Sequence, residues 1–102
     1  MANPHRGEVE VVVDGVPRVA RLTLGALAEL EEELGEGSLV ALVERLEGGR
    51  VSSRDVLSLL VAGLRGGGWD VTRGNLIASD VAGGPVGATR AAALLLARAF
   101  TP

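Results

Sequence analysis

The chain has 102 residues, 47% hydrophobic and 23% charged, which fits one globular domain, residues 1–102, with a small core. It contains no cysteine, which excludes disulfides, zinc fingers of the cysteine type and thiol nucleophiles. The net charge is −3 and all ten basic residues are arginine, a balance that disfavours binding to nucleic acid. No apolar run approaches the ~18 residues of a membrane span, and the amino end lacks the apolar middle of a signal peptide. We therefore expect a soluble, cytoplasmic protein that binds no membrane.

The amino-terminal part predicts a flexible tail, residues 1–7, followed by a β-hairpin, residues 8–22. The first strand is rich in β-branched side chains, and Asp14-Gly15 is a strong turn signal. From Arg18 onward the second strand alternates polar with apolar side chains. One face of this hairpin needs a helix to cover it, since an isolated hairpin is only marginally stable. The apolar side chains expected on that face are Val9, Val11, Ala20 and Leu22.

The expected register depends on a four-residue loop, residues 14–17. This loop places Glu10 opposite Arg21 and Val12 opposite Val19.

Residues 23–102 predict a helical part with about five short helices. Thr23 can cap the first, which ends at Gly35 and carries Leu27, Leu30 and Leu34 on one side. Ser38 opens a short second helix, which stops at two glycines and has an apolar stripe made of Leu39, Leu42, Val43 and Leu46. The predicted fold class is therefore α+β, with an N-terminal β-hairpin packed on a helical bundle.

Three further helices follow. Ser52 and Asp55 resemble a capping box, and the helix that they open is apolar around most of its circumference, so we expect it at the centre of the core. Thr72 can cap a fourth helix over residues 73–81, and Pro85 can begin a fifth that runs to about Phe100.

The last helix is apolar on nearly every side, with Thr89, Arg90 and Arg98 as its polar residues. Such a helix is expected to be buried nearly all round. Two arrangements satisfy this requirement: contact with a second chain, or wrapping by the hairpin and the third helix.

The residues give little support for an enzyme. The single histidine, His5, lies in the expected tail, and the absence of lysine excludes a Schiff base and a P-loop. The glycine run 66–68 lacks the spacing of a phosphate-binding motif, and the aspartates follow no calcium-loop spacing. We therefore expect a non-catalytic protein without cofactor or metal.

Acidic residues concentrate near the carboxyl end of the first helix, at positions 29, 31, 32, 33 and 36. Negative charge at this end opposes the helix dipole. Two interpretations stay open: a solvated helix face, or a surface that receives an arginine- or lysine-rich partner helix.

Three stretches carry a family resemblance: residues 1–9 (MANPHRGEV), 22–31 (LTLGALAELE) and 62–68 (AGLRGGG), followed by an alanine- and leucine-rich last helix. In this order they resemble the small phage-type tail assembly proteins encoded by bacterial gene transfer agents.

The resemblance implies a cytoplasmic tail assembly chaperone of a gene transfer agent or prophage, which binds the tape-measure protein or another tail protein. The alternative that it implies is a structural, tube-associated tail subunit. Self-association into a homo-oligomer fits both roles. The hypothesised partner-binding residues are Glu29, Glu32, Glu33, Glu36, Leu95 and Phe100.

Overall fold

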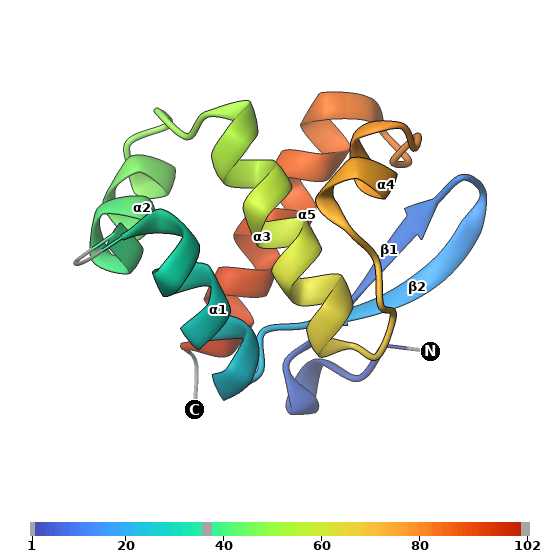
Figure 1. Cartoon of the computed structure of the whole chain (residues 1–102), viewed down its shortest axis with the longest axis horizontal. Helices are drawn as coiled ribbons and strands as arrows, with labels where there is room; N and C mark the ends of the chain where they lie inside the picture. The colour runs from blue at the N-terminus through green and yellow to red at the C-terminus, as the bar shows by residue number, and fades with distance from the viewer. Residues whose placement is uncertain (1, 36–37, 101–102) are drawn as a thin grey trace.

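The computed structural model describes residues 2–35 and 38–100 and confirms the α+β fold class (Figure 1). A 3-10 turn, η1 (Pro4–Arg6), precedes a two-stranded antiparallel sheet, after which five α-helices are described. The strands are β1 (Glu8–Val13) and β2 (Val16–Arg21). The helices are α1 (Leu24–Leu34), α2 (Ser38–Glu47), α3 (Ser53–Gly66), α4 (Arg73–Ile77) and α5 (Gly84–Ala99).

The hairpin turn is tighter than the sequence predicted. Asp14 and Gly15 both adopt positive φ, 50° and 78°, as a two-residue turn of the primed type requires. Val12 therefore pairs with Pro17, and the predicted four-residue loop and its register are wrong by two residues. A shift of two preserves the side-chain faces, so the prediction of the buried face is confirmed for Val9, Val11, Ala20 and Leu22.

Helix α3 is the centre of the core, as the sequence predicted. It begins with a capping box, in which the Ser52 hydroxyl accepts from the Asp55 N–H and the Asp55 carboxylate accepts from the Ser52 N–H. Its buried side chains include Leu59, Leu60 and Leu64. Two glycines let the end of α3 approach the sheet, because a Cβ at Gly66 would lie 2.0 Å from the carbonyl oxygen of Arg21 and one at Gly67 would lie 1.9 Å from that of Val19.

The fourth helix is shorter than predicted, because α4 ends at Ile77 rather than at residue 81. The next segment instead pairs with the outer edge of β1. Asp14 N–H donates to the Asp80 carbonyl and Ala82 N–H donates to the Val12 carbonyl, around a bridge between Val13 and Val81. The sheet edge thus supplies the backbone partners that a longer helix would have supplied.

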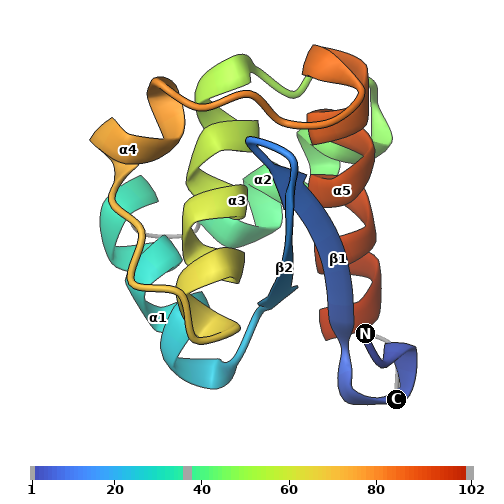
Figure 2. The same cartoon turned by 90° about the vertical axis from the view of Figure 1, so that its right-hand side faces the viewer.

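Helix α5 lies beside both β1 and α3 (Figure 2). Its inner side buries Ala92, Leu95 and Leu96, whereas Val86 and Leu94 stay exposed on its outer side. The hairpin and α3 therefore bury one side of α5, and on the outer side Val86 and Leu94 remain exposed with the exposed Arg90 between them. None of the helices in the described residues is long and apolar enough to cross a membrane.

Candidate interaction surface

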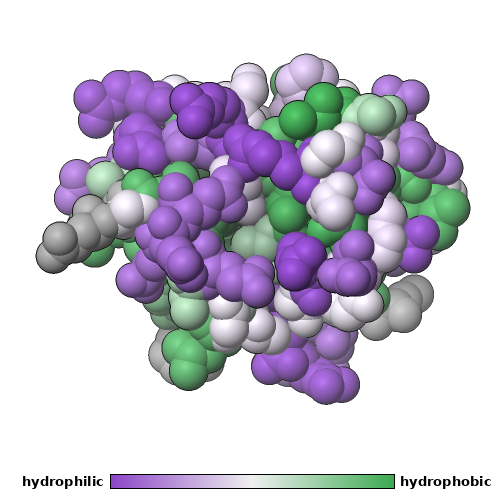
Figure 3. All heavy atoms as spheres, viewed as in Figure 1, coloured by the Kyte–Doolittle hydropathy of each residue, from purple (hydrophilic) through white to green (hydrophobic). Residues whose placement is uncertain are grey.

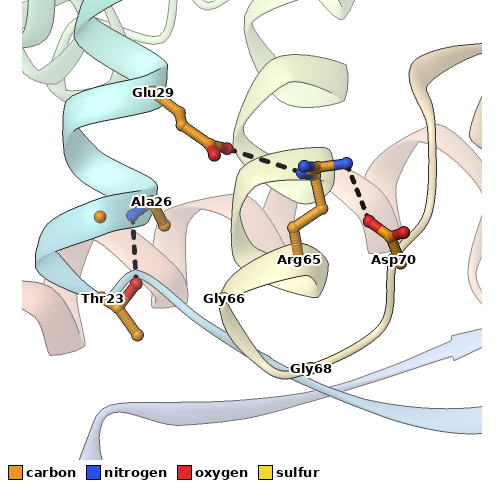
Figure 4. Close-up of a pocket in the computed structure, with 8 residues that line it drawn as sticks. Thr23, Ala26, Glu29, Arg65, Gly66, Gly68 and Asp70 are labelled. Carbon is orange, nitrogen blue, oxygen red and sulfur yellow. Dashed lines mark hydrogen bonds and ion pairs between the residues drawn. The ribbon is translucent and has the colours of Figure 1, made fainter.

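Charged side chains from α1, α3, α4 and the loop between α3 and α4 form an ion-pair belt, which comprises Glu29, Glu33, Arg65, Asp70 and Arg73. The Arg65 guanidinium lies between two carboxylates, with Nε 3.5 Å from Glu29 and Nη1 3.3 Å from Asp70 (Figure 4). One helical turn along α1, Glu33 lies 2.6 Å from Nη1 of Arg73. The i, i+4 spacing of the two glutamates places both on the face of α1 that meets these arginines.

The cavity in Figure 4 has a volume of about 310 Å³ and lies between the start of α1 and the end of α3. The Thr23 hydroxyl at its edge accepts from the Ala26 N–H, which caps α1. The glycines Gly66 and Gly68 line its other side. Arg65 also lines the cavity and is paired with the carboxylates of Glu29 and Asp70. Its charged groups are thus engaged in ion pairs, and the arrangement joins α1 to α3 and to the loop that follows.

A buried hydroxyl extends the belt into the core. Ser58 on α3 is buried and donates to Glu33 Oε1 over 2.9 Å, while Arg73 Nη1 donates to the Ser58 Oγ over 2.9 Å. A second cavity, of about 420 Å³, opens beside this triad. The sequence pattern gave no functional prediction for Ser58 or Arg73; the available signal was a single serine within the apolar middle of α3.

A further ion pair connects α2 to α3. Arg45 donates two hydrogen bonds to Asp55, each 3.0 Å long. The Arg45 guanidinium lowers the pKa of Asp55, burial opposes this effect, and the Ser52 N–H and hydroxyl lower the pKa further. The hydrogen bonds that Arg45 donates to Asp55 also raise the pKa of Arg45.

The residues hypothesised to bind a partner lie in different environments. Glu29 and Glu33 form ion pairs within the chain, whereas Glu32 is exposed and makes no ion pair in the part of the chain that the structure describes. Leu95 is 0% exposed and belongs to the core, while Phe100 is 57% exposed. Glu36 lies outside the described residues.

Large apolar side chains are also exposed on several elements. Figure 3 shows that, on the face drawn, hydrophobic areas alternate with a larger hydrophilic area. Exposed side chains of this size are found on α1, α2, α5 and at other positions, namely Val16, Leu24, Val40, Ile77, Val86, Leu94 and Phe100. Within residues 2–35 and 38–100, no group of three or more His, Cys, Asp or Glu side chains could hold a metal ion.

These features define a small α+β protein whose surface combines ion pairs with scattered apolar side chains. Residues 6–101 match the family described as phage tail tube protein, GTA-gp10, and the chain belongs to this family. The match spans all the strands and α-helices described above. No match is found among curated proteins or among solved structures.

Membership of this family confirms the expected relation to phage tails and gene transfer agents. The family description fits the tube-associated alternative better than the assembly chaperone that we put first.

Proposed function

We propose that the protein is a non-catalytic structural subunit of a phage-type tail, associated with the tail tube of a gene transfer agent or prophage. The observation that carries the proposal is the family match over residues 6–101, which includes both strands and the five described α-helices rather than one motif. The subunit acts by contact with other tail proteins and with copies of itself.

The surface supports this proposal. Leu24, Ile77 and Val86 are large apolar side chains that are mostly exposed, and each lies on a different helix. Exposed apolar groups gain free energy when an assembly buries them. A subunit that contacts neighbours on several sides needs such groups on more than one side.

The composition of purified particles tests the proposal. A tagged copy is expressed in a producing strain, and its amount per particle is measured by quantitative mass spectrometry against known head and tail proteins. We expect many copies per particle, retained through density-gradient purification. Absence from mature particles, together with presence in the lysate, overturns the proposal.

A tail assembly chaperone that binds the tape-measure protein is the second candidate, and the sheet favours it. The β1 edge is covered by residues 80–82 and by Arg98, which donates to the Glu8 carbonyl, while the end of α3 lies against the β2 edge. Because these edges are covered, few backbone N–H and C=O groups are free to pair with a strand of a neighbouring subunit. Exposed apolar side chains on helices suit binding to another helix.

Co-sedimentation with the tape-measure protein of the same gene cluster separates the two candidates. A soluble complex with that protein, combined with absence from the mature particle, supports the chaperone. Many copies in the particle without such a complex support the structural subunit.

A further inference from the structure

A cavity lined by basic side chains lies apart from the ion-pair belt, where η1, the end of β2 and the last turn of α5 meet. In Figure 2, η1 and the last turn of α5 lie beside each other at the lower right. The cavity has a volume of about 230 Å³. We name it the basic cavity, because Arg6, Arg21 and Arg98 line it together with His5.

The formally charged side chains that line the basic cavity are all arginines, among the residues that the structure describes. The cavities beside the ion-pair belt differ, because carboxylates line them as well as arginines and the opposite charges largely cancel. A cavity whose charged groups share one sign attracts ions of the opposite sign. The basic cavity is therefore a candidate site for an anion.

Glu8 is the carboxylate that contacts these arginines, and it is largely engaged. One of its oxygens accepts from the Asn3 N–H over 2.7 Å, and the other lies 4.0 Å from Arg6 Nε. Glu10 lies on the same side of β1 but is paired with Val19 in the register and does not line the cavity. Three guanidinium groups against one carboxylate leave two positive charges in excess.

Most of the guanidinium N–H groups at the basic cavity have no partner within the described residues. The Arg21 side chain makes neither an ion pair nor a hydrogen bond there, although Glu8 is opposite it in the register. Arg98 donates through Nη1 to the Glu8 carbonyl, which holds its guanidinium in place and leaves its other N–H groups without a partner there. Each guanidinium carries five N–H donors, so several remain for a ligand.

The backbone at the basic cavity is held in place before any ligand binds. The Asn3 carbonyl accepts from the N–H groups of Arg6 and Glu8, over 3.0 and 3.1 Å, which fixes η1 at the start of β1. Gly7 has a φ of 76°, and a Cβ on it would lie 3.8 Å from the Arg98 carbonyl oxygen, so η1 lies close to the last turn of α5. Donors that are already ordered lose less entropy when a ligand binds.

We propose that the basic cavity binds a phosphate group, either as inorganic phosphate or as the end of a small phosphate monoester. Two positive charges in excess match a phosphate dianion, and guanidinium groups donate pairs of hydrogen bonds to its oxygens. Donors on three segments suit a tetrahedral ion, whose oxygens point in several directions, better than a planar carboxylate.

The size of the basic cavity indicates a small ligand. Its volume of about 230 Å³ is below the about 300–1,000 Å³ that is typical of sites for drug-sized molecules. Duplex DNA is a less suitable ligand, because the cavity holds few arginines and the chain has a net charge of −3. The site goes beyond the proposed role in the tail and does not depend on it, since binding is measured on the purified protein.

Titration of the 102-residue chain with inorganic phosphate tests the proposal, followed by NMR of the backbone amides at constant ionic strength. At about pH 7.5 a phosphate group carries close to two negative charges. We expect saturable shifts of the amides of Gly7, Leu22 and Ala99, which line the cavity. Acetate at the same concentration should produce much smaller shifts. Methyl phosphate separates the two sources: its binding shows that the site accepts a monoester, and binding of inorganic phosphate alone assigns the site to the free ion.

Single substitutions test the arginines. Arg21→Gln should weaken phosphate binding about tenfold, because it removes a charged donor that has no other partner. Arg6→Gln provides a second variant at an exposed side chain, where folding is not at risk. Arg90→Gln is the matched control, since Arg90 is exposed on α5 and does not line the cavity. Arg98 is left unchanged because its hydrogen bond to Glu8 supports the fold.

Glu8→Gln provides a test that a folding defect cannot imitate. The glutamine oxygen can still accept from the Asn3 N–H, but the negative charge beside the arginines is gone. We expect phosphate to bind about fivefold more tightly to this variant.

Four results overturn the proposal. They are an absence of saturable shifts at the cavity amides, equal weakening by Arg21→Gln and Arg90→Gln, acetate binding as tight as phosphate binding, and a Glu8→Gln variant that binds phosphate no better than the native protein. Larger shifts of the same amides with duplex DNA than with phosphate would assign the cavity to a nucleic-acid backbone and overturn it as well.

Discussion

The carboxylate of Asp55 receives two hydrogen bonds of 3.0 Å from the guanidinium of Arg45, ten residues earlier in the chain. The Asp55 side chain is only 9% exposed, and it also accepts from the N–H of Ser52, the residue that caps α3. The Asp55 carboxylate therefore links α2 to α3 and also completes the cap at the start of α3.

The pH dependence of stability follows from this pair. Because the folded-state pKa of Asp55 lies below its unfolded value, its contribution to stability is full above the unfolded pKa of about 3.8. That contribution is lost as the pH falls through the folded pKa. We expect Asp55→Asn to lower the free energy of unfolding by about 1.5 kcal/mol at pH 7 and the two proteins to converge in acid. Urea unfolding from pH 7 to pH 3 measures this difference.

Asp70→Asn is the matched control: its side chain is 94% exposed, so solvent screens its ion pair with Arg65 and the pair contributes little to stability. It should leave the urea midpoint at pH 7 unchanged within error. An equal loss of unfolding free energy in both variants would show that the ion pair of Asp55 with Arg45 adds no stability beyond that of an exposed carboxylate.

The close approach of α3 to β2 predicts an intolerance of side chains at Gly66. A Cβ there lies 2.0 Å from the Arg21 carbonyl oxygen, so backbone must move. We expect Gly66→Ala to destabilise the fold by about 3 kcal/mol, measured by thermal melting. Gly25→Ala is the control, because its nearest atom, the Thr23 hydroxyl, is 3.9 Å away and alanine favours the helix. Similar melting of both variants would contradict the predicted clash.

Two adjacent glutamates are expected to behave differently. Glu33→Gln weakens the ion pair with Arg73 and the hydrogen bond from Ser58, which should cost about 0.5–1 kcal/mol because the rim of this site is exposed to solvent. Glu32→Gln removes an exposed carboxylate and should leave the melt unchanged. Differential scanning calorimetry of both variants at low salt compares them, and a larger loss for Glu32 would refute this division.

Two neighbouring leucines on α5, Leu94 and Leu95, are expected to have different roles, one in assembly and the other in folding stability. Leu95→Ala removes a side chain that is 0% exposed and should cost about 3 kcal/mol. Leu94 is 39% exposed, so Leu94→Ser should retain the fold and reduce the incorporation of the protein into particles. Chemical denaturation and particle composition report the two effects. Normal incorporation of a folded Leu94→Ser variant would exclude this side chain from the assembly contacts.

Local patterns were sufficient to predict most elements of the fold. Thr23, Ser52 and Thr72 cap helices as predicted, because a capping hydroxyl acts on an N–H only three residues away. The burial of Val9 and Val11 followed from the alternation of the strand. The register could not be predicted from the same pattern, since a shift of two residues leaves every side chain on its own face.

Non-local pairing decided the features that the sequence left open. Residues 78–81 continue a helical pattern, yet they leave the helix because the edge of β1 offers them hydrogen bonds. The glutamates of α1 form one cluster in the sequence, but arginines 36 and 40 residues away pair with Glu29 and Glu33 and leave Glu32 exposed.

By itself, then, the sequence determined the helix starts, the hairpin faces, the central helix and the resemblance to phage tail proteins, because these depend on contacts within a few residues or on the order of motifs. Only the tertiary structure decided which charges are neutralised, which leucine of α5 is buried, and where Arg6, Arg21 and Arg98 meet. Those outcomes depend on distances between segments that are far apart in the chain, and periodicity within one helix or strand carries no information about them.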